Sequence, residues 1–223
     1  MKPLYIFILI VVNLVNTQNV DPVWTFVCKD KHCQKVRVQP GEESKSVSIA
    51  ACKISCDPYG TLWPQPTGDV HLGGELVPID PNQIQVNEKH KTNKLITAGY
   101  RHFQSNVQKL SPSQLQNAPG GSLIVTLDIA DLNQTQLKLT TSESYTLRIT
   151  QLPNGSINAT ISAPTYFGGR HGLESLGQLI IYDDIRNNLQ IPNDVYITDG
   201  PVYPYRGIAL DTARNYISVD TIK

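Results

Sequence analysis

The sequence predicts an α+β domain in which antiparallel strands form a sheet and helices cover it. Apolar and polar residues alternate along 145–149 and again along 157–161, as they do in half-buried strands. Pro153-Asn154-Gly155 lies between these two segments and is the strongest hairpin signal in the chain. After this hairpin the apolar residues change to helical spacing, which predicts the covering layer.

The covering helix is predicted over 170–182, directly after two consecutive glycines. Leu173, Leu176 and Ile180 recur there at helical spacing and should pack on the sheet. A shorter amphipathic helix is predicted over 100–110, where apolar residues share one face.

Further strands are predicted along the rest of the chain. Short alternating segments at 36–38 and 47–49 flank a Pro-Gly turn, and a third strand is expected over 83–86. The strongest isolated strand signal is the apolar run over 123–129. A short apolar segment at 195–198 precedes a proline-rich joint.

The length of the chain and its net charge limit the classes of function that it can have. The 223 residues correspond to one large domain, or to one and a half, and suffice for a buried core. The chain carries 19 basic and 19 acidic side chains, so its formal net charge is zero. We expect no nucleic-acid partner, because binding to phosphates depends on a basic excess.

The N-terminus predicts a signal peptide over 1–18. Lys2 supplies a positive charge, and residues 4–12 form an apolar run that is too short for a membrane-spanning helix. The alternative is an uncleaved membrane anchor. No other stretch is long and apolar enough to span a bilayer, so we expect a secreted or lysosomal protein without stable membrane insertion.

All four cysteines, Cys28, Cys33, Cys52 and Cys56, lie near the N-terminus. A zinc site is one interpretation, but the two-residue gaps typical of zinc knuckles are absent, and an exported chain enters an oxidising compartment. We therefore expect two disulfides. Three connectivities remain open; those that join the first pair to the second, and so link two strands, are favoured.

Three N-glycosylation sequons begin at Asn133, Asn154 and Asn158. Strand alternation places Asn158 on the polar face of its strand, whereas Asn154 occupies the tight turn. Asn158 is therefore the preferred glycan site.

The segment His71-Leu72-Gly73-Gly74-Glu75 looks like the start of a His-x-Gly-Gly-acid-acid motif of certain glycosidases. The second acid is missing, because residue 76 is leucine. We expect a glycine turn before the sheet, without a catalytic role.

Three segments carry a family resemblance: LWPQPTG over 62–68, APTYFGGRHGLESL over 163–176 and PYRGIALDTARNY over 204–216. From Trp24 onward the chain resembles eukaryotic β-N-acetylhexosaminidases of glycoside hydrolase family 20. Within that family it is most similar to the arthropod chitooligosaccharide-degrading β-N-acetylglucosaminidases.

The resemblance implies a domain organisation. Residues 19–200 would form the family's non-catalytic N-terminal α+β domain, with 21–60 as a disulfide-stapled segment. Residues 201–223 would begin a catalytic (β/α)₈ barrel, which usually contains ~250 residues. We therefore expect this chain to be an N-terminal fragment of a longer enzyme.

The resemblance also implies retaining hydrolysis in which the substrate's own acetamido oxygen is the nucleophile. An Asp-Glu pair in a His-x-Gly-Gly-Asp-Glu motif assists that reaction. This motif does not occur among the 223 residues, so we expect no catalytic residue in this chain and no activity of the chain alone. No metal and no cofactor is implied.

One substrate-binding residue maps onto this sequence. Arg206 matches the family arginine that holds ring hydroxyls of the terminal sugar; the alternative is a salt bridge at the domain seam. Asp211 and Arg214 match positions that we expect to pair inside the barrel. His171 and Glu174 match the helix block and are interpreted as domain-interface residues.

The leading hypothesis is therefore the N-terminal part of a secreted hexosaminidase that acts on chitooligosaccharides or, alternatively, on N-glycans. A homodimer is one option for the intact enzyme. The alternative is a genuinely short secreted glycoprotein, such as a non-catalytic carbohydrate-binding module. A third hypothesis, a disulfide-stapled adhesion domain, predicts that residues 21–60 fold alone.

Overall fold

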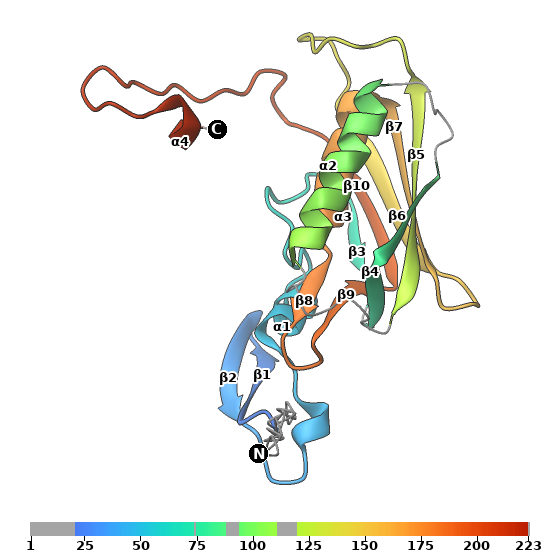
Figure 1. Cartoon of the computed structure of the whole chain (residues 1–223), viewed down its shortest axis with the longest axis vertical. Helices are drawn as coiled ribbons and strands as arrows, with labels where there is room; N and C mark the ends of the chain where they lie inside the picture. The colour runs from blue at the N-terminus through green and yellow to red at the C-terminus, as the bar shows by residue number, and fades with distance from the viewer. Residues whose placement is uncertain (1–20, 74, 88–93, 111–119, 223) are drawn as a thin grey trace, which may run out of the picture.

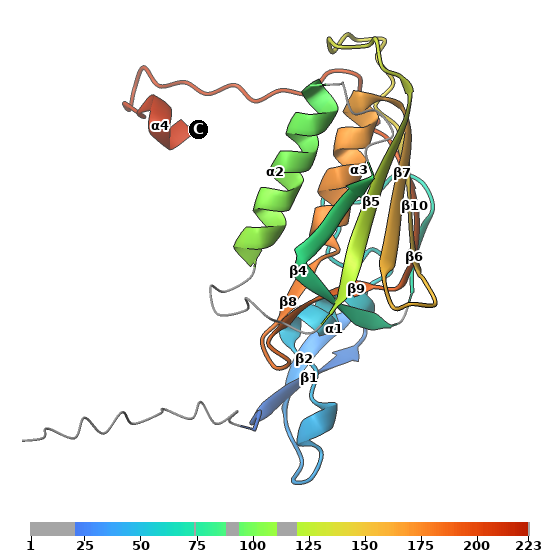
Figure 2. The same cartoon turned by 45° about the vertical axis from the view of Figure 1, so that its right-hand side comes forward.

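An eight-stranded sheet covered by two long helices forms the body of the computed structural model, which describes residues 21–73, 75–87, 94–110 and 120–222 (Figure 1). Its strands are β3 (Val70–Leu72), β4 (Leu76–Asn87), β5 (Gly121–Asp131), β6 (Tyr145–Gln151), β7 (Ile157–Thr165), β8 (Ile181–Asp183), β9 (Asn188–Pro192) and β10 (Asp194–Asp199). They are ordered β3-β10-β6-β7-β5-β4-β9-β8. Helices α2 (Lys94–Leu110) and α3 (Tyr166–Gln178) lie side by side in a second layer, which Figure 2 shows edge-on.

The predicted α+β class and the central hairpin are confirmed. β6 and β7 pair antiparallel, with Ile149 opposite Ala159, and Gly155 takes a positive φ of 82° in the turn between them. The sheet is nevertheless mixed, so the prediction of an antiparallel sheet is wrong at two pairings. β5 runs parallel to both β4 and β7. Between β4 and β5 the reason is α2, which carries the chain back to the end from which β4 started.

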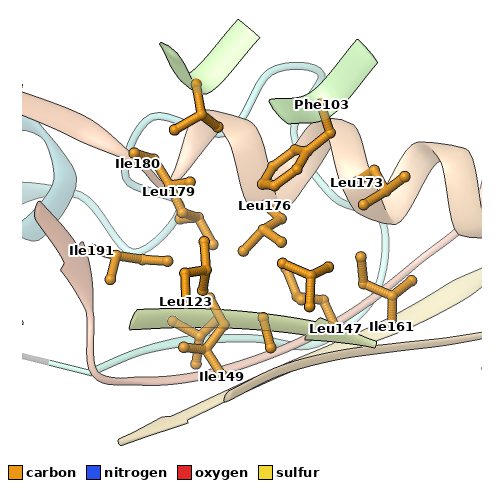
Figure 3. Close-up of a cluster of buried hydrophobic side chains, with 14 of the residues drawn as sticks. Phe103, Leu123, Leu147, Ile149, Ile161, Leu173, Leu176, Leu179, Ile180 and Ile191 are labelled. Atoms are coloured by element: carbon orange, nitrogen blue, oxygen red, sulfur yellow. The ribbon is translucent and has the colours of Figure 1, made fainter. Parts of the chain in front are cut away.

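The core lies between the sheet and the helices. Leu147, Ile149 and Ile161 on the strands and Leu176 on α3 are fully buried, as Figure 3 shows for the cluster that they form. These are the residues that the sequence alternation and helical spacing predict to face inward. The polar residues between them, such as Asn158, lie on the opposite face of the sheet.

Helix α3 begins at Tyr166 and ends at Gln178, so the predicted bounds of 170–182 are wrong at both ends. The paired glycines do not precede the helix but lie inside it. A Cβ on Gly169 would stand 2.6 Å from Ile129 Cδ1, and one on Gly172 would stand 2.5 Å from Ile161 Cγ2. Glycine is required here because the helix backbone lies directly on the side chains of the sheet.

The predicted glycine turn before the sheet is wrong in its placement, because His71 and Leu72 belong to strand β3 and strand β4 begins at Leu76. β3 pairs antiparallel with β10 and β4 pairs antiparallel with β9, so one strand pair continues into the other around a corner. Asn193 lies at this corner and donates its backbone N–H to the carbonyl oxygen of Glu75 (3.0 Å). A Cβ on Gly73 would stand 2.5 Å from the carbonyl oxygen of Asp194, so the two backbone segments lie too close together for a side chain at this position.

A small disulfide-bonded unit precedes the large sheet. Strands β1 (Trp24–Lys29) and β2 (His32–Arg37) form a hairpin that packs on helix α1 (Ile49–Cys56). The predicted strand over 47–49 is wrong, because Ser48 caps this helix by accepting a hydrogen bond from the N–H of Ala51 (3.1 Å).

The expected disulfides are present as Cys28–Cys56 and Cys33–Cys52. They join the first cysteine pair to the second, as favoured, but they link a hairpin to a helix and not two strands. Because both pairs are bonded, the zinc interpretation is set aside. Ala51 and Ile54 of α1 belong to the same buried cluster as the large sheet, which argues against a stapled segment that folds alone.

After β10 the chain leaves the sheet and runs away from it to the short helix α4 (Val219–Ile222), as both views show (Figures 1 and 2). Residues 201–218 pair with no strand in the described part of the chain, so the predicted start of a barrel stays a prediction. The predicted signal peptide lies outside the described residues. Among the described helices, none has the length and apolar character needed to cross a membrane.

Replacing Gly168 by Ala should destabilise the fold by about 1–3 kcal/mol, the usual cost of overpacking. A Cβ at Gly168 would collide with the backbone carbonyl oxygen of Ser144, which cannot rotate aside. Gly177→Ala is the matched control, since its Cβ would find its nearest neighbour at 4.0 Å and should gain up to about 1 kcal/mol of helix propensity. Urea unfolding of both variants measures the difference; equal stabilities would contradict the close contact.

Removing the disulfide between Cys33 and Cys52 as a double alanine variant should lower the free energy of unfolding by about 3 kcal/mol. The reason is that this bridge closes a loop of sequence separation 19 and so restricts the unfolded chain. Thermal unfolding with and without reductant provides the measurement. If the variant and the oxidised wild type unfold at the same temperature, the bridge does not contribute as expected.

Candidate functional site

The most distinctive polar site is centred on the buried carboxylate of Glu143, which is only 8% exposed. Its Oε2 accepts a hydrogen bond from Nε2 of His171 (2.9 Å) and another from Nη2 of Arg206 (2.6 Å). The three residues come from the segment before β6, from α3 and from the segment after β10. The site therefore joins three parts of the chain that are distant in sequence.

The position of Glu143 follows from how tightly its segment is held. On one side, Thr165 Oγ1 donates a hydrogen bond to the carbonyl oxygen of Ser142 (2.7 Å), and Gly168 lies against the carbonyl of Ser144. On the other side, a Cβ on Gly200 would stand 3.2 Å from Ser144 Cβ. The first turn of α3 and the end of β10 thus fix the segment that carries the carboxylate.

The two hydrogen-bonding partners of Glu143 decide its ionisation. Burial alone would raise the pKa of this carboxyl, but hydrogen bonds from Arg206 and His171, together with their positive charges, outweigh it. The pKa of Glu143 is therefore held below its usual range. The group is a buried carboxylate anion at neutral pH, and each of its two partners lies within hydrogen-bonding distance.

Arg206 is predicted from sequence to bind a sugar, and the structure places it in an ion pair. Besides the bond to Glu143, its Nη1 donates to the carbonyl oxygen of Tyr203 (2.6 Å). A guanidinium carries five N–H groups, and these two bonds use one on each terminal nitrogen. Within the described part of the chain, no other hydrogen bond to this guanidinium occurs. The side chain is 42% exposed, so it is accessible to a ligand.

The motif segment 62–68 runs between the end of α3 and the end of β10. Gln178 clamps the backbone of Trp63, accepting from its N–H (2.8 Å) and donating to its carbonyl oxygen (2.7 Å). At the other end, Asp199 accepts the N–H of Thr67 (2.9 Å) and a longer bond from the hydroxyl of Tyr145 (3.3 Å). Burial, followed by the nearby charge of Asp199, raises the pKa of Tyr145, which therefore stays protonated.

The remaining predicted residues lie away from Glu143. Asn133 and Asn154 are exposed in turns, and Asn158 is half-buried on β7. Asp211 and Arg214 are exposed in the segment after β10 and form no ion pair within the described residues. The sequons and the role of Arg214 therefore stay predictions.

Glu174, interpreted from sequence as a domain-interface residue, and the segment 71–75, for which no catalytic role is expected, also lie away from Glu143. Glu174 is exposed on α3. In the segment 71–75, His71 Nε2 lies 3.4 Å from Asp194 Oδ2 and Glu75 Oε2 lies 3.4 Å from Asn193 Nδ2. Both contacts lie at the corner where β3 and β10 meet β4 and β9.

Comparison with known families identifies the domain. A model described as "beta-acetyl hexosaminidase like" matches residues 62–179, which is more than half of the chain. The chain belongs to this beta-acetyl hexosaminidase-like family. The resemblance to family 20 hexosaminidases that the three motifs indicate is thereby confirmed.

Individual relatives of this hexosaminidase-like chain agree with that assignment. It is 42% identical over 221 residues to the chitooligosaccharidolytic beta-N-acetylglucosaminidase of Bombyx mori, and 41% identical over 224 residues to that of Ostrinia furnacalis. These alignments cover 98% and 99% of this chain but only 37% and 38% of the relatives. The chain therefore spans less than two fifths of their length.

A solved structure shares the fold. The chitobiase of Flavobacterium johnsoniae superposes with a TM-score of 0.53 over 72% of this chain and 24% of its own, at 24% sequence identity. This likeness supports the α+β architecture described above.

The central residue of the site, Glu143, is missed by sequence analysis. It stands just before a predicted strand and has no motif of its own. Its partners lie 28 and 63 residues away, so no local spacing connects them. The sequence offered one indirect signal. His171 and, in one interpretation, Arg206 are expected at the domain interface, and two basic side chains at one interface predict an acidic partner between them.

Replacing Glu143 by Gln should lower the free energy of unfolding at neutral pH by about 1–3 kcal/mol, because two donors lose a charged acceptor. Because the pKa of Glu143 is lower in the folded than in the unfolded chain, its ionisation stabilises the fold at pH values above the unfolded pKa of about 4.3. This stabilisation disappears as the pH falls through the pKa of the folded state. The difference in free energy of unfolding between wild type and variant should therefore become smaller below about pH 4.

Urea unfolding at several pH values from pH 7 to pH 3 measures this difference in free energy of unfolding. Glu174→Gln removes the same charge from an exposed position and serves as the control, with little expected change. A gap that stays constant over the whole range would contradict an ionised Glu143.

Proposed function

We propose that this chain is the N-terminal, non-catalytic part of a longer β-N-acetylhexosaminidase that removes terminal N-acetylglucosamine from chitooligosaccharides. The observation that carries the proposal is the alignment of nearly the whole chain with two proteins named as chitooligosaccharidolytic enzymes. Family membership favours this function over a short non-catalytic glycoprotein or carbohydrate-binding module. Two disulfides and an N-terminal apolar run support export of the protein.

In this proposal the chemistry is retaining and substrate-assisted. The acetamido oxygen of the substrate attacks, and an Asp-Glu pair orients it and transfers the proton. Residues 1–223 contain no His-x-Gly-Gly-Asp-Glu motif, so the pair would be supplied by a part of the enzyme outside this sequence. The contribution of this chain is structural support and one arginine.

Arg206 is proposed to hold ring hydroxyls of the terminal sugar. A guanidinium presents its donors as a rigid fork, which suits two neighbouring hydroxyl oxygens. Its partial exposure and its uncommitted N–H groups support this role. In the same proposal, 201–223 begin the barrel; the exposed apolar side chains of Val202, Tyr205 and Ile208 would then be covered by its other strands.

The proposal predicts how two protein products behave toward a chromogenic N-acetylglucosaminide. The product of the full-length transcript should hydrolyse it, and the 223-residue chain should not. In the active product, Arg206→Lys should lower kcat/KM about 10- to 100-fold, because lysine cannot make the paired hydrogen bonds. Most of the loss should appear in KM.

Two results would contradict the proposal. The first is turnover by the purified 223-residue chain that Glu75→Gln abolishes, since that would move catalysis to the segment 71–75. The second is a transcript whose reading frame stops after codon 223, because the short product would then be the whole protein. Arg101→Lys, the same replacement at an exposed position on α2, controls for general effects of replacing arginine.

A further inference from the structure

We propose that Glu143 is a positioning residue for substrate binding: its buried carboxylate holds the guanidinium of Arg206 in the orientation in which that group receives the sugar. This inference rests on the proposed role of Arg206. It goes beyond that role by assigning a function in the site to a residue of the non-catalytic domain.

The first step of the argument is the geometry of the guanidinium. One terminal nitrogen donates to Glu143 (2.6 Å) and the other to the carbonyl oxygen of Tyr203 (2.6 Å). Two bonds on different nitrogens fix both the position and the plane of the group. Three N–H groups are left over for a ligand.

The second step is the rigidity of the anchor. The carboxylate of Glu143 is 8% exposed, receives a further hydrogen bond from His171 and sits on a segment held by α3 and by the end of β10. Arg206, by contrast, belongs to a segment whose residues are exposed from 201 to 216. The ion pair therefore links an exposed segment to a fixed point of the sheet domain.

The third step is the energetic consequence. A free arginine side chain loses much rotamer freedom when it binds a ligand, and that loss weakens binding. Glu143 removes this freedom before the substrate arrives, so the remaining donors are already oriented. Binding depends on such orientation because two neighbouring hydroxyls are held together only when the planar guanidinium presents its donors to both of them at once.

The first test measures the restraint in the 223-residue chain itself. Trypsin must take the arginine side chain into its own pocket, so a guanidinium held by Glu143 protects the bond after Arg206. Arg214 lies in the same exposed segment and is the internal reference. In Glu143→Gln, the ratio of initial cleavage rates at Arg206 and Arg214, measured by mass spectrometry, should rise roughly tenfold.

Glu174→Gln removes one negative charge from an exposed site on α3 and should leave the ratio unchanged. An unchanged ratio in folded Glu143→Gln would overturn the proposal. If that variant does not fold, side-chain NMR of the wild type decides: hindered rotation of the Arg206 guanidinium supports the proposal, and rotation as free as that of Arg214 overturns it.

The second test uses the full-length enzyme and separates positioning from mere stability. Glu143→Gln should raise KM about tenfold and change kcat by less than about threefold, and Glu143→Asp should recover part of the loss because it keeps the charge. An unchanged KM would overturn the positioning role even if the trypsin ratio rises. If instead Arg206→Lys leaves KM unchanged, the proposed function of Arg206 has failed, and the inference about Glu143 is overturned with it.

Discussion

The close contact between α3 and the sheet is the constraint on which the rest of the structure depends. Gly168, Gly169 and Gly172 give the helix a face without side chains, so its backbone lies on strand residues such as Ile161. This distance lets Leu176 fill the space above the sheet. It also places His171, one turn after Gly168, against the carboxylate of Glu143.

Packing and electrostatics are therefore coupled in this domain. A buried carboxylate is costly unless charged partners and hydrogen bonds compensate for the lost water. Glu143 obtains one partner from the packed helix and the other from the segment that leaves the sheet after β10. The motif segment 62–68 ends beside the same exit, because Asp199 holds Thr67. The motif segments 62–68 and 163–176 therefore both lie close to the start of the third motif segment, 204–216.

Much of the fold could be predicted from local pattern. Alternation identified β6 and β7 together with their buried residues, an apolar run identified β5, and Gly155 marked the turn. Prediction failed where local signals are ambiguous. Two glycines usually end or precede a helix, but here they lie inside α3 because the sheet comes too close for a Cβ. The same limit applies to 47–49, where Ser48 caps a helix that alternation alone reads as a strand.

By itself, the sequence determined the α+β class, the inward-facing residues, the disulfide-forming cysteines and the family, because these depend on composition, on short periodicities or on contiguous motifs. Only the tertiary structure decided the parallel pairing of β5, the disulfide connectivity and the site around Glu143. Each of these joins residues that are far apart in the chain. Such contacts depend on how the elements pack in three dimensions, and packing leaves no local pattern in the order of the residues.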